Sequence, residues 1–267
     1  MQLPLDGRVA VVTGVSRRRG IGAAVARVLA EMGASLVVQH HRPHDMAQPW
    51  GADDLGEVLA DLRDHLVPGA DLHHLAADLA APDAAGELIE HARELAGPLD
   101  ILVCVHARSG GDACLAEITA EQLDGHWNVD ARSVLLLTQA FMQVHDPHRV
   151  GGRVIWMTSG QQQGIMPAEI GYASAKAALA GVTRTVADEL IEQGIVMNTV
   201  NPGPVNTGYL DPGQGIDDTS LESLKRRFPT GRFGTPEDPA RLIGWLVSDD
   251  AQWIVGQVIN SEGGFRR

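Results

Sequence analysis

The chain has 267 residues, with 34 Asp or Glu against 21 Lys or Arg, which gives a net charge of −13 at pH 7. That charge opposes nonspecific attraction to nucleic acids and anionic membranes, so we expect neither as a partner. The start, MQLPLDGRVA, lacks a basic segment followed by an apolar one, and no apolar run reaches the roughly 18 residues of a membrane span. We expect a soluble, cytoplasmic protein with one domain over residues 1–267.

Short apolar runs alternate with stretches of helical periodicity along the chain. The runs lie at Val9 to Thr13, Ser35 to Gln39, Leu99 to Val105, Arg153 to Met157, Ile195 to Val200 and Gly256 to Ile259. The helical stretches lie near residues 21–32, 54–66, 83–96, 119–144, 172–193 and 236–248. This alternation is typical of strands buried on both faces of a parallel sheet. We therefore predict an α/β, doubly wound sheet that binds its ligand beyond the carboxyl ends of its strands.

The first predicted strand runs directly into the glycine-rich loop TGVSRRRGIG, residues 13–22. Glycines at a strand-to-helix junction permit a tight turn and a close backbone approach to a pyrophosphate, which the free amides of the following helix can bind. An ordinary glycine-rich turn is the alternative interpretation. The predicted cofactor contacts in this loop are Gly14, Ser16, Arg17, Arg18, Arg19, Gly20, Ile21 and Gly22.

The second predicted strand ends in Gln-His-His-Arg, without the Asp or Glu that would hold an adenine ribose with a free 2′-hydroxyl. Arg42 stands there instead, and the arginines of the glycine loop precede it. Guanidinium groups bind a 2′-phosphate through paired, charge-assisted hydrogen bonds. We predict that one or more of Arg17, Arg18 and Arg19, together with Arg42, selects NADP(H) over NAD(H). The alternative is that these arginines only solubilise an exposed loop.

Tyr172 and Lys176 stand four residues apart near the start of a predicted helix, in a chain with only two tyrosines. At this spacing both side chains lie on one helix face, where the ammonium lowers the pKa of the phenol and makes Tyr172 a general acid and base. Ser159 would hold the oxygen of a carbonyl or alcohol, and Lys176 would also hold the nicotinamide ribose. A surface Tyr and Lys on an amphipathic helix are the alternative.

Further motifs follow in chain order: AADL around Asp78, DILV, YASAK, NPGPVNTG and GRFGTPEDPARLIGWLVSDDAQWIVGQVINSEGG. Together with the glycine-rich loop, they make essentially the whole chain resemble the classical short-chain dehydrogenase/reductase family, nearest to its 3-oxoacyl-carrier-protein-reductase-like members. The resemblance implies a Rossmann fold and an NAD(P)-dependent oxidoreductase in which Tyr172 transfers the proton, Lys176 assists and Ser159 orients the reacting oxygen. It also implies a dimer or tetramer.

The same resemblance supplies further cofactor contacts. Asp78, with Leu79 beside it, would meet the adenine, and Pro202, Gly203, Val205 and Thr207 would border the nicotinamide.

The sequence departs from the family pattern at three places. Five residues separate Gly14 from Gly20, more than is usual. The family's Asn-Asn-Ala-Gly after the fourth strand is replaced by Cys-Val-His-Ala at residues 104–107, which removes side-chain amides that tie neighbouring strands. Asp130 stands where the family has a proton-relay asparagine; it can accept hydrogen bonds but cannot donate an amide proton, and its charge would act on Lys176 and Tyr172. We keep Asp130 as a catalytic candidate.

The polar, glycine-rich segment 208–231 is typical of a lid over a substrate. Histidines at 40, 41, 44, 73 and 74 lack a set of carboxylate or thiol partners, so we predict no metal site. The predicted function is an NADPH-preferring oxidoreductase for a small-molecule carbonyl/secondary alcohol pair. Imine reduction or redox isomerisation is the alternative within enzymes, and a catalytically silent, cofactor-binding scaffold is the alternative outside them.

Overall fold

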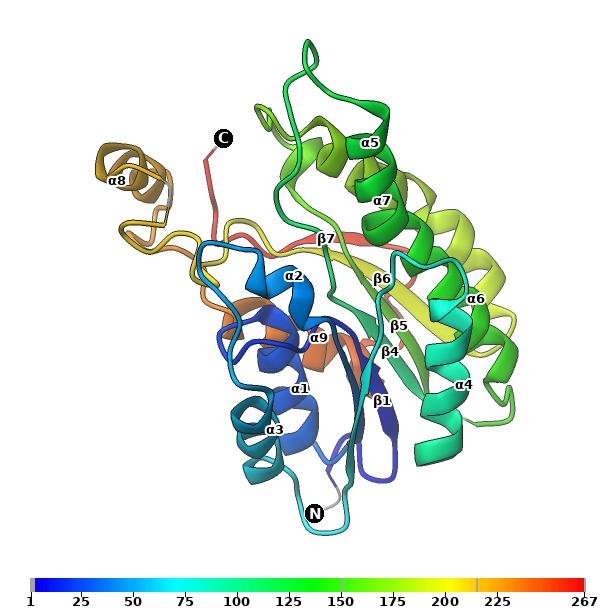
Figure 1. Cartoon of the computed structure of the whole chain (residues 1–267). Coiled ribbons are helices and arrows are strands. Elements are labelled where there is room, and N and C mark those ends of the chain that lie inside the picture. The colour runs from blue at the N-terminus through cyan, green and yellow to red at the C-terminus, as the bar shows by residue number, and fades with distance from the viewer. Residues whose placement is uncertain (1–2, 150, 215, 267) are drawn as a thin grey trace.

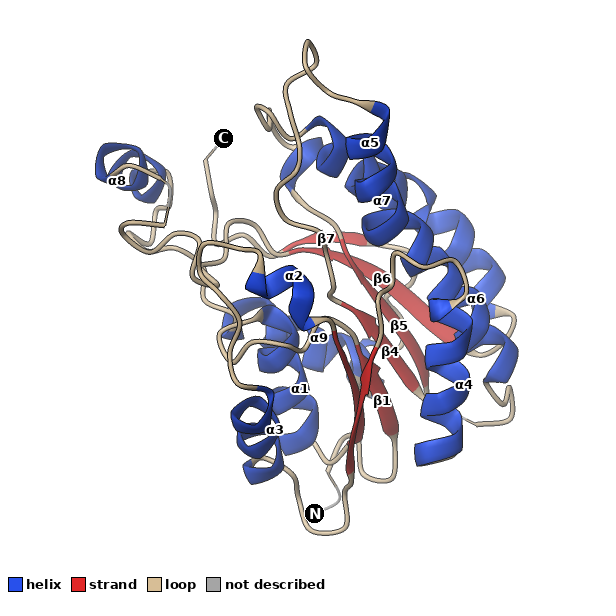
Figure 2. Ribbon diagram, viewed as in Figure 1, coloured by secondary structure: helices blue, strands red, loops and turns tan. Residues whose placement is uncertain are grey.

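The computed structural model describes residues 3–149, 151–214 and 216–266. Over these residues, seven parallel strands form one sheet in the order β3-β2-β1-β4-β5-β6-β7 (Figure 2). Their bounds are β1 Val9–Val12, β2 Ser35–His40, β3 Leu72–Ala76, β4 Ile101–Cys104, β5 Gly152–Met157, β6 Ile195–Asn201 and β7 Val258–Asn260. The predicted doubly wound α/β sheet is confirmed.

Helices cover both faces of the sheet (Figure 1). One face carries α1 (Ile21–Glu31), α3 (Leu55–Asp64) and α9 (Glu237–Val247). The other carries α4 (Ala84–Ala96), α6 (Ser133–Val144) and α7 (Ile170–Ile191), with α5 (Ala120–Trp127) packed against α7. Two short helices, α2 (Arg42–Met46) and α8 (Asp218–Arg226), belong to connections beyond the carboxyl ends of strands.

The core consists of two apolar clusters, one on each side of the sheet. Val12, Leu29 and Ile243 belong to the cluster under α1 and α9. Phe141 and Trp156 belong to the cluster under α6, and both are fully buried. Because β1, β4, β5 and β6 contribute to both clusters, their side chains are buried in either direction, which is why these strands read as continuous apolar runs.

The strand order reverses at β1, which lies between β2 and β4. Val12 pairs in register with Val38 of β2 and with Val103 of β4. The loops that follow these three strands therefore leave the sheet at one level. A crevice at such a reversal is the usual ligand site of a doubly wound sheet.

Three elements differ from the sequence expectation. Strand β3 was not predicted, because it is an edge strand with a half-exposed sequence, Leu-His-His-Leu-Ala, instead of an apolar run. Arg42, expected at the end of the second strand, instead begins α2, whose second residue is proline. The single helix expected over 119–144 is interrupted by η1, a π-helical turn at Asn128–Arg132.

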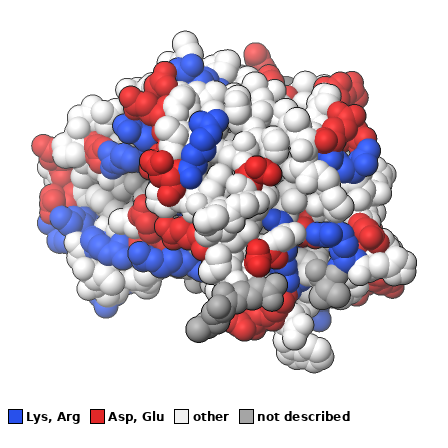
Figure 3. Space-filling model, turned by 90° about the horizontal axis from the view of Figure 1, so that it is seen from below, with Lys and Arg blue, Asp and Glu red and all other residues white. Residues whose placement is uncertain are grey.

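Acidic and basic side chains stand beside one another on the face shown in Figure 3. Among the described residues, no helix combines the length and apolarity that crossing a membrane would require.

Candidate active site

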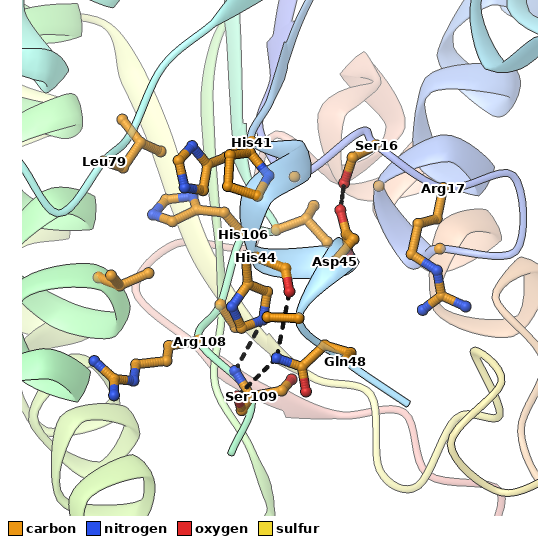
Figure 4. A pocket seen from close by; sticks show the side chains of 18 of the residues that line it. Ser16, Arg17, His41, His44, Asp45, Gln48, Leu79, His106, Arg108 and Ser109 are labelled. Atoms are coloured by element: carbon orange, nitrogen blue, oxygen red, sulfur yellow. Dashed lines mark hydrogen bonds between the residues drawn. The ribbon is translucent and has the colours of Figure 1, made fainter. Parts of the chain in front are cut away.

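A cavity of about 670 Å³ lies at the strand-order reversal, and the loops after β1, β2 and β4 form its walls (Figure 4). The lining also includes Asp78, Leu79 and Ala80 after β3, Val129 of the π-helical turn η1, and Thr207 after β6. The side chains of His44 and Asp45, in α2, also face the cavity, and so does that of Gln48, which follows the helix. The cavity therefore occupies the position that the fold predicts for a ligand.

The glycine-rich loop brings the start of α1 against the end of β1. Gly14 has a φ of +74°, a conformation that favours glycine. A Cβ on Gly22 would lie 2.4 Å from the carbonyl oxygen of Gly14, so the helix can approach this closely only with glycine there. The backbone of Gly20 caps α1 without a side-chain hydrogen bond. The first amides of α1 remain available to an anion in the cavity.

The three loop arginines have different surroundings. Arg17 lines the cavity, donates a 2.7 Å hydrogen bond from Nη2 to the carbonyl oxygen of Thr207, and lies 5.7 Å from the ring centre of Trp50. Arg18 forms a 3.4 Å ion pair with Glu57. Arg19 forms a 2.7 Å ion pair with Asp211. Neither Arg18 nor Arg19 is among the residues that line the cavity, so only Arg17 of the three faces it.

Asp45 is an acidic residue of the cavity wall that the sequence reasoning did not find. Its carboxylate accepts a hydrogen bond from the hydroxyl of Ser16 (Figure 4). Burial lowers the pKa of Arg17, while the charge of Asp45 raises it, so the carboxylate attracts the guanidinium. Recognition of α2 would have revealed Asp45, because one helical turn brings it back towards the loop after β1.

The other predicted cofactor contacts divide into two groups. Those that line the cavity are Gly14, Ser16, Gly20, Ile21, Gly22, Asp78, Leu79 and Thr207. Those outside the lining are Arg42, Tyr172, Lys176, Pro202, Gly203 and Val205. Arg42 has a buried Nε without a hydrogen-bond partner among the described residues, and Val205, in the segment after β6, is buried.

Ser159, Tyr172 and Lys176 come together where β5 and α7 meet. Lys176 is buried and donates a 3.2 Å hydrogen bond from Nζ to the carbonyl oxygen of Met157, the last residue of β5. The same Nζ lies 5.7 Å from the ring centre of Tyr172. The side chain of Ser159 lies close enough to the phenol of Tyr172 to lower its pKa. A proton donor and an ammonium on α7 thus lie beside a hydroxyl from the loop after β5.

The pKa values in this group differ from the sequence expectation. Burial raises the pKa of Tyr172 and the charge of Asp130 raises it further, which outweighs the lowering effect of the Ser159 side chain. The expected net lowering by Lys176 is therefore wrong for this structure. Burial also lowers the pKa of Lys176, against the opposing effect of Asp130. Tyr172 consequently keeps its proton at neutral pH.

Asp130 lies in the π-helical turn η1 and is completely buried. One of its oxygens accepts a 2.8 Å hydrogen bond from the backbone N–H of Arg108. The other lies 2.8 Å from Nδ1 of His126. Sequence reasoning identified Asp130 but missed His126, although the four-residue spacing places both on one side of a helix.

His106 bridges three elements at the floor of the cavity. Its Nδ1 lies 2.6 Å from the hydroxyl of Thr13, after β1, and its Nε2 lies 2.8 Å from the hydroxyl of Ser133, in α6. Burial and the charge of Lys176 lower its pKa to about 4, so the ring is neutral at pH 7. The ring links neighbouring strands where the Asn-Asn-Ala-Gly amides are missing.

The segment expected to form a lid contacts the glycine-rich loop. Asp211 of this segment forms the ion pair with Arg19, and the ring of Tyr209 meets the ring of Trp50, which follows α2, edge to face with the ring centres 6.4 Å apart. Within this segment, α8 stands away from the body of the molecule (Figure 1). Among the described residues, no cluster of three or more His, Cys, Asp or Glu side chains could hold a metal ion.

Comparison with known protein families gives the same assignment as the geometry. Residues 14–266 match the model of a family described as enoyl-(acyl carrier protein) reductase. The chain belongs to the short-chain dehydrogenase/reductase family. YjdA of Bacillus subtilis, named as an uncharacterized oxidoreductase, is 35% identical over 263 residues, which cover 97% of each protein. Versicolorin reductase stcU of Emericella nidulans is 30% identical over 271 residues, with 97% and 96% covered.

Solved structures of this family superimpose over nearly the whole chain. A 3-oxoacyl (acyl-carrier-protein) reductase from Agrobacterium tumefaciens, solved with NADP bound, has a TM-score of 0.84 at 27% identity and covers 98% of this chain and 95% of its own. A short-chain dehydrogenase/reductase from Serratia marcescens has a TM-score of 0.83 at 28% identity, with 99% and 100% covered. This protein is therefore an NAD(P)-dependent oxidoreductase of the family.

Proposed function

We propose that this oxidoreductase interconverts a carbonyl and a secondary alcohol, prefers NADPH, and uses Tyr172 as its general acid and base. The observation that carries the proposal is that Ser159, Tyr172 and Lys176 lie together where β5 and α7 meet, beside the cavity that the glycine-rich loop lines. The domain would be the whole chain, 1–267, with residues 208–231 covering the substrate.

The cavity residues fit a dinucleotide phosphate. Gly14, Gly20 and Gly22 line the cavity without side chains, which leaves room for a pyrophosphate, and Arg17 has a buried Nε without a hydrogen-bond partner among the described residues. Arg17 would hold the 2′-phosphate, Asp78 and Leu79 the adenine, and Thr207 the nicotinamide half. A bound nicotinamide would supply or accept the hydride.

The chain's own residues would handle the oxygen and its proton. The hydroxyl of Ser159 holds the carbonyl oxygen, and the phenol of Tyr172 donates to it. Because burial raises the pKa of Tyr172, the phenol is protonated at neutral pH, which suits reduction. The ammonium of Lys176, fixed by the carbonyl of Met157, stabilises the phenolate left after transfer.

The proposal extends to assembly and location. Leu123 and Trp127 of α5 and Val182 of α7 are partly exposed apolar side chains on helices that pack together. Such a face favours a homodimer or homotetramer through α5 and α7. Both cysteines, Cys104 and Cys114, are free thiols, which fits the proposed location in the cytoplasm. Light scattering of the purified protein measures the oligomeric state.

The test is a fluorescence titration with NADPH and NADH at matched salt, followed by turnover assays. The substrate panel would hold simple ketones, an oxoacyl thioester, an imine and hydroxylated naphthalenes, since several relatives are named as hydroxynaphthalene or versicolorin reductases. We expect tighter binding of NADPH and turnover of a ketone. Equal binding would refute the cofactor preference, and turnover of the imine alone would refute the carbonyl assignment.

A further inference from the structure

A histidine lies between two carboxylates beneath the predicted catalytic helix. His126, at the end of α5, is 1% exposed in its side chain, Asp130 is 0% exposed and Asp112 is 6% exposed. Nδ1 of His126 lies 2.8 Å from Asp130, and Nε2 lies 3.6 Å from Asp112. These three residues come from a loop, a helix and a π-helical turn, and they form one connected buried group.

Asp112 fixes the first turn of α7. Its carboxylate accepts backbone hydrogen bonds of 2.9 Å from Gly171 and 2.8 Å from Tyr172. Although burial raises the pKa of Asp112, these bonds and one from Ala113 hold that pKa below its usual value. The carboxylate is therefore charged and caps α7 at the turn that carries Tyr172.

His126 touches the same turn directly. A Cβ on Gly171 would lie 2.9 Å from Cδ2 of the imidazole, so the ring packs against the helix backbone itself. The ring centres of His126 and Tyr172 are 6.1 Å apart, edge to face. The imidazole thus occupies the space between the start of α7 and the turn that holds Asp130.

We propose that His126 is a positioning residue, whose Nδ1–H donates to the second oxygen of Asp130 and so holds that buried carboxylate in place. An ionised carboxylate only accepts, and one oxygen of Asp130 already accepts from the backbone of Arg108. The second oxygen requires a donor inside the protein, and Nδ1–H of His126 provides it. Through this bond and its packing on Gly171, His126 sets the placement of Tyr172 relative to Lys176.

This inference rests on the proposed function, and a double-mutant cycle tests it. His126→Val leaves Asp130 buried without its donor, so we expect kcat for ketone reduction to fall about 10- to 100-fold while the Kd for NADPH stays within about threefold. In an Asp130→Asn background the same substitution should lower kcat less than about threefold, since no unpaired carboxylate remains. His126→Gln, which keeps a donor, should retain more kcat than His126→Val.

The matched control is His145→Val. His145 is also a buried histidine whose Nε2 has no hydrogen-bond partner among the described residues, but it stacks on Phe141, away from the site. The His145→Val variant should have a lower free energy of unfolding but an unchanged kcat. An equal fall in kcat from His126→Val in both backgrounds would overturn the inference.

If the parent protein turns over no substrate, the proposed function fails. The interaction between His126 and Asp130 is then tested by urea unfolding alone. His126→Val must then destabilise the parent more than it destabilises the Asp130→Asn variant. If the two substitutions lowered the free energy of unfolding additively, the inference would be overturned, whatever the protein's function.

Discussion

The ammonium nitrogen of Lys176 lies over the ring of Tyr172, 5.7 Å from its centre. One helical turn separates the two residues on α7, and the carbonyl of Met157 holds the nitrogen from the sheet side. Lys176 is buried and Tyr172 is partly buried, so the protein contributes strongly to the electrostatics of the pair. The pH dependence of the reaction follows from the effect of this environment on the pKa of Tyr172.

The two directions of the reaction should respond differently to pH. Reduction needs the protonated phenol, and because the pKa of Tyr172 is raised, kcat for reduction should not decline as pH rises from about 6 to about 9. Oxidation needs the phenolate, so its kcat should rise with pH over the same interval. Steady-state rates in both directions measure this. A reduction rate that halves near pH 7 would show a different acid.

Arg17 should carry the cofactor preference. Arg17→Ser removes the guanidinium that faces the cavity, so the Kd for NADPH should rise about 10- to 100-fold while that for NADH changes little. Arg18→Ser and Arg19→Ser are matched controls from the same loop, because their side chains pair with Glu57 and Asp211. Three equal effects would show that the loop's total charge matters, and not the position of Arg17.

Two glycines on helices should respond oppositely to alanine. Gly22→Ala places a Cβ 2.4 Å from the oxygen of Gly14, so the variant should unfold at a lower temperature and bind NADPH weakly. A Cβ on Gly86 of α4 meets nothing within 4 Å, and Gly86→Ala should stabilise by about 0.5–1 kcal/mol. Thermal unfolding of both variants compares them. A tolerated alanine at 22 would disprove the close approach.

His106 should make stability depend on pH below neutrality. Its pKa falls from 6.5 to about 4 on folding, so the unfolded state binds the proton first as pH decreases. The contribution is complete above pH 6.5 and should be lost between pH 6.5 and about 4, to a total of about 3 kcal/mol.

Urea unfolding of the parent and of His106→Ala at several pH values measures how much His106 contributes to the pH dependence of stability. The variant should show a smaller loss of stability across that interval, whatever its stability at pH 7. The exposed histidine variant His91→Ala serves as control. The same pH slope in all three proteins would contradict the buried, neutral state of His106.

The strands buried on both faces were predictable, because their environment demands continuous apolar runs. Strand β3 was not, since an edge strand with His73 and His74 has no such pattern. The short helix α2 was also missed, because five residues contain too little periodicity, and with it Asp45 in the cavity wall.

Local spacing identified Tyr172, Lys176 and Ser159, since the chemistry requires those residue types together. The roles of single arginines were not predictable, because Arg17, Arg18 and Arg19 differ only in the partners that folding brings to each. The group formed by Asp112, His126 and Asp130 likewise joins a loop to two helical elements, and only its His-to-Asp spacing is visible in the sequence.

The most direct test of the central claim is Tyr172→Phe, measured for turnover and for NADPH binding in the same preparation. The phenyl ring keeps the packing on α7 but cannot donate a proton. We expect kcat to fall about 10²- to 10⁴-fold while the Kd for NADPH stays within about twofold. Turnover equal to that of the parent protein would show that Tyr172 is not the acid and would contradict the mechanism.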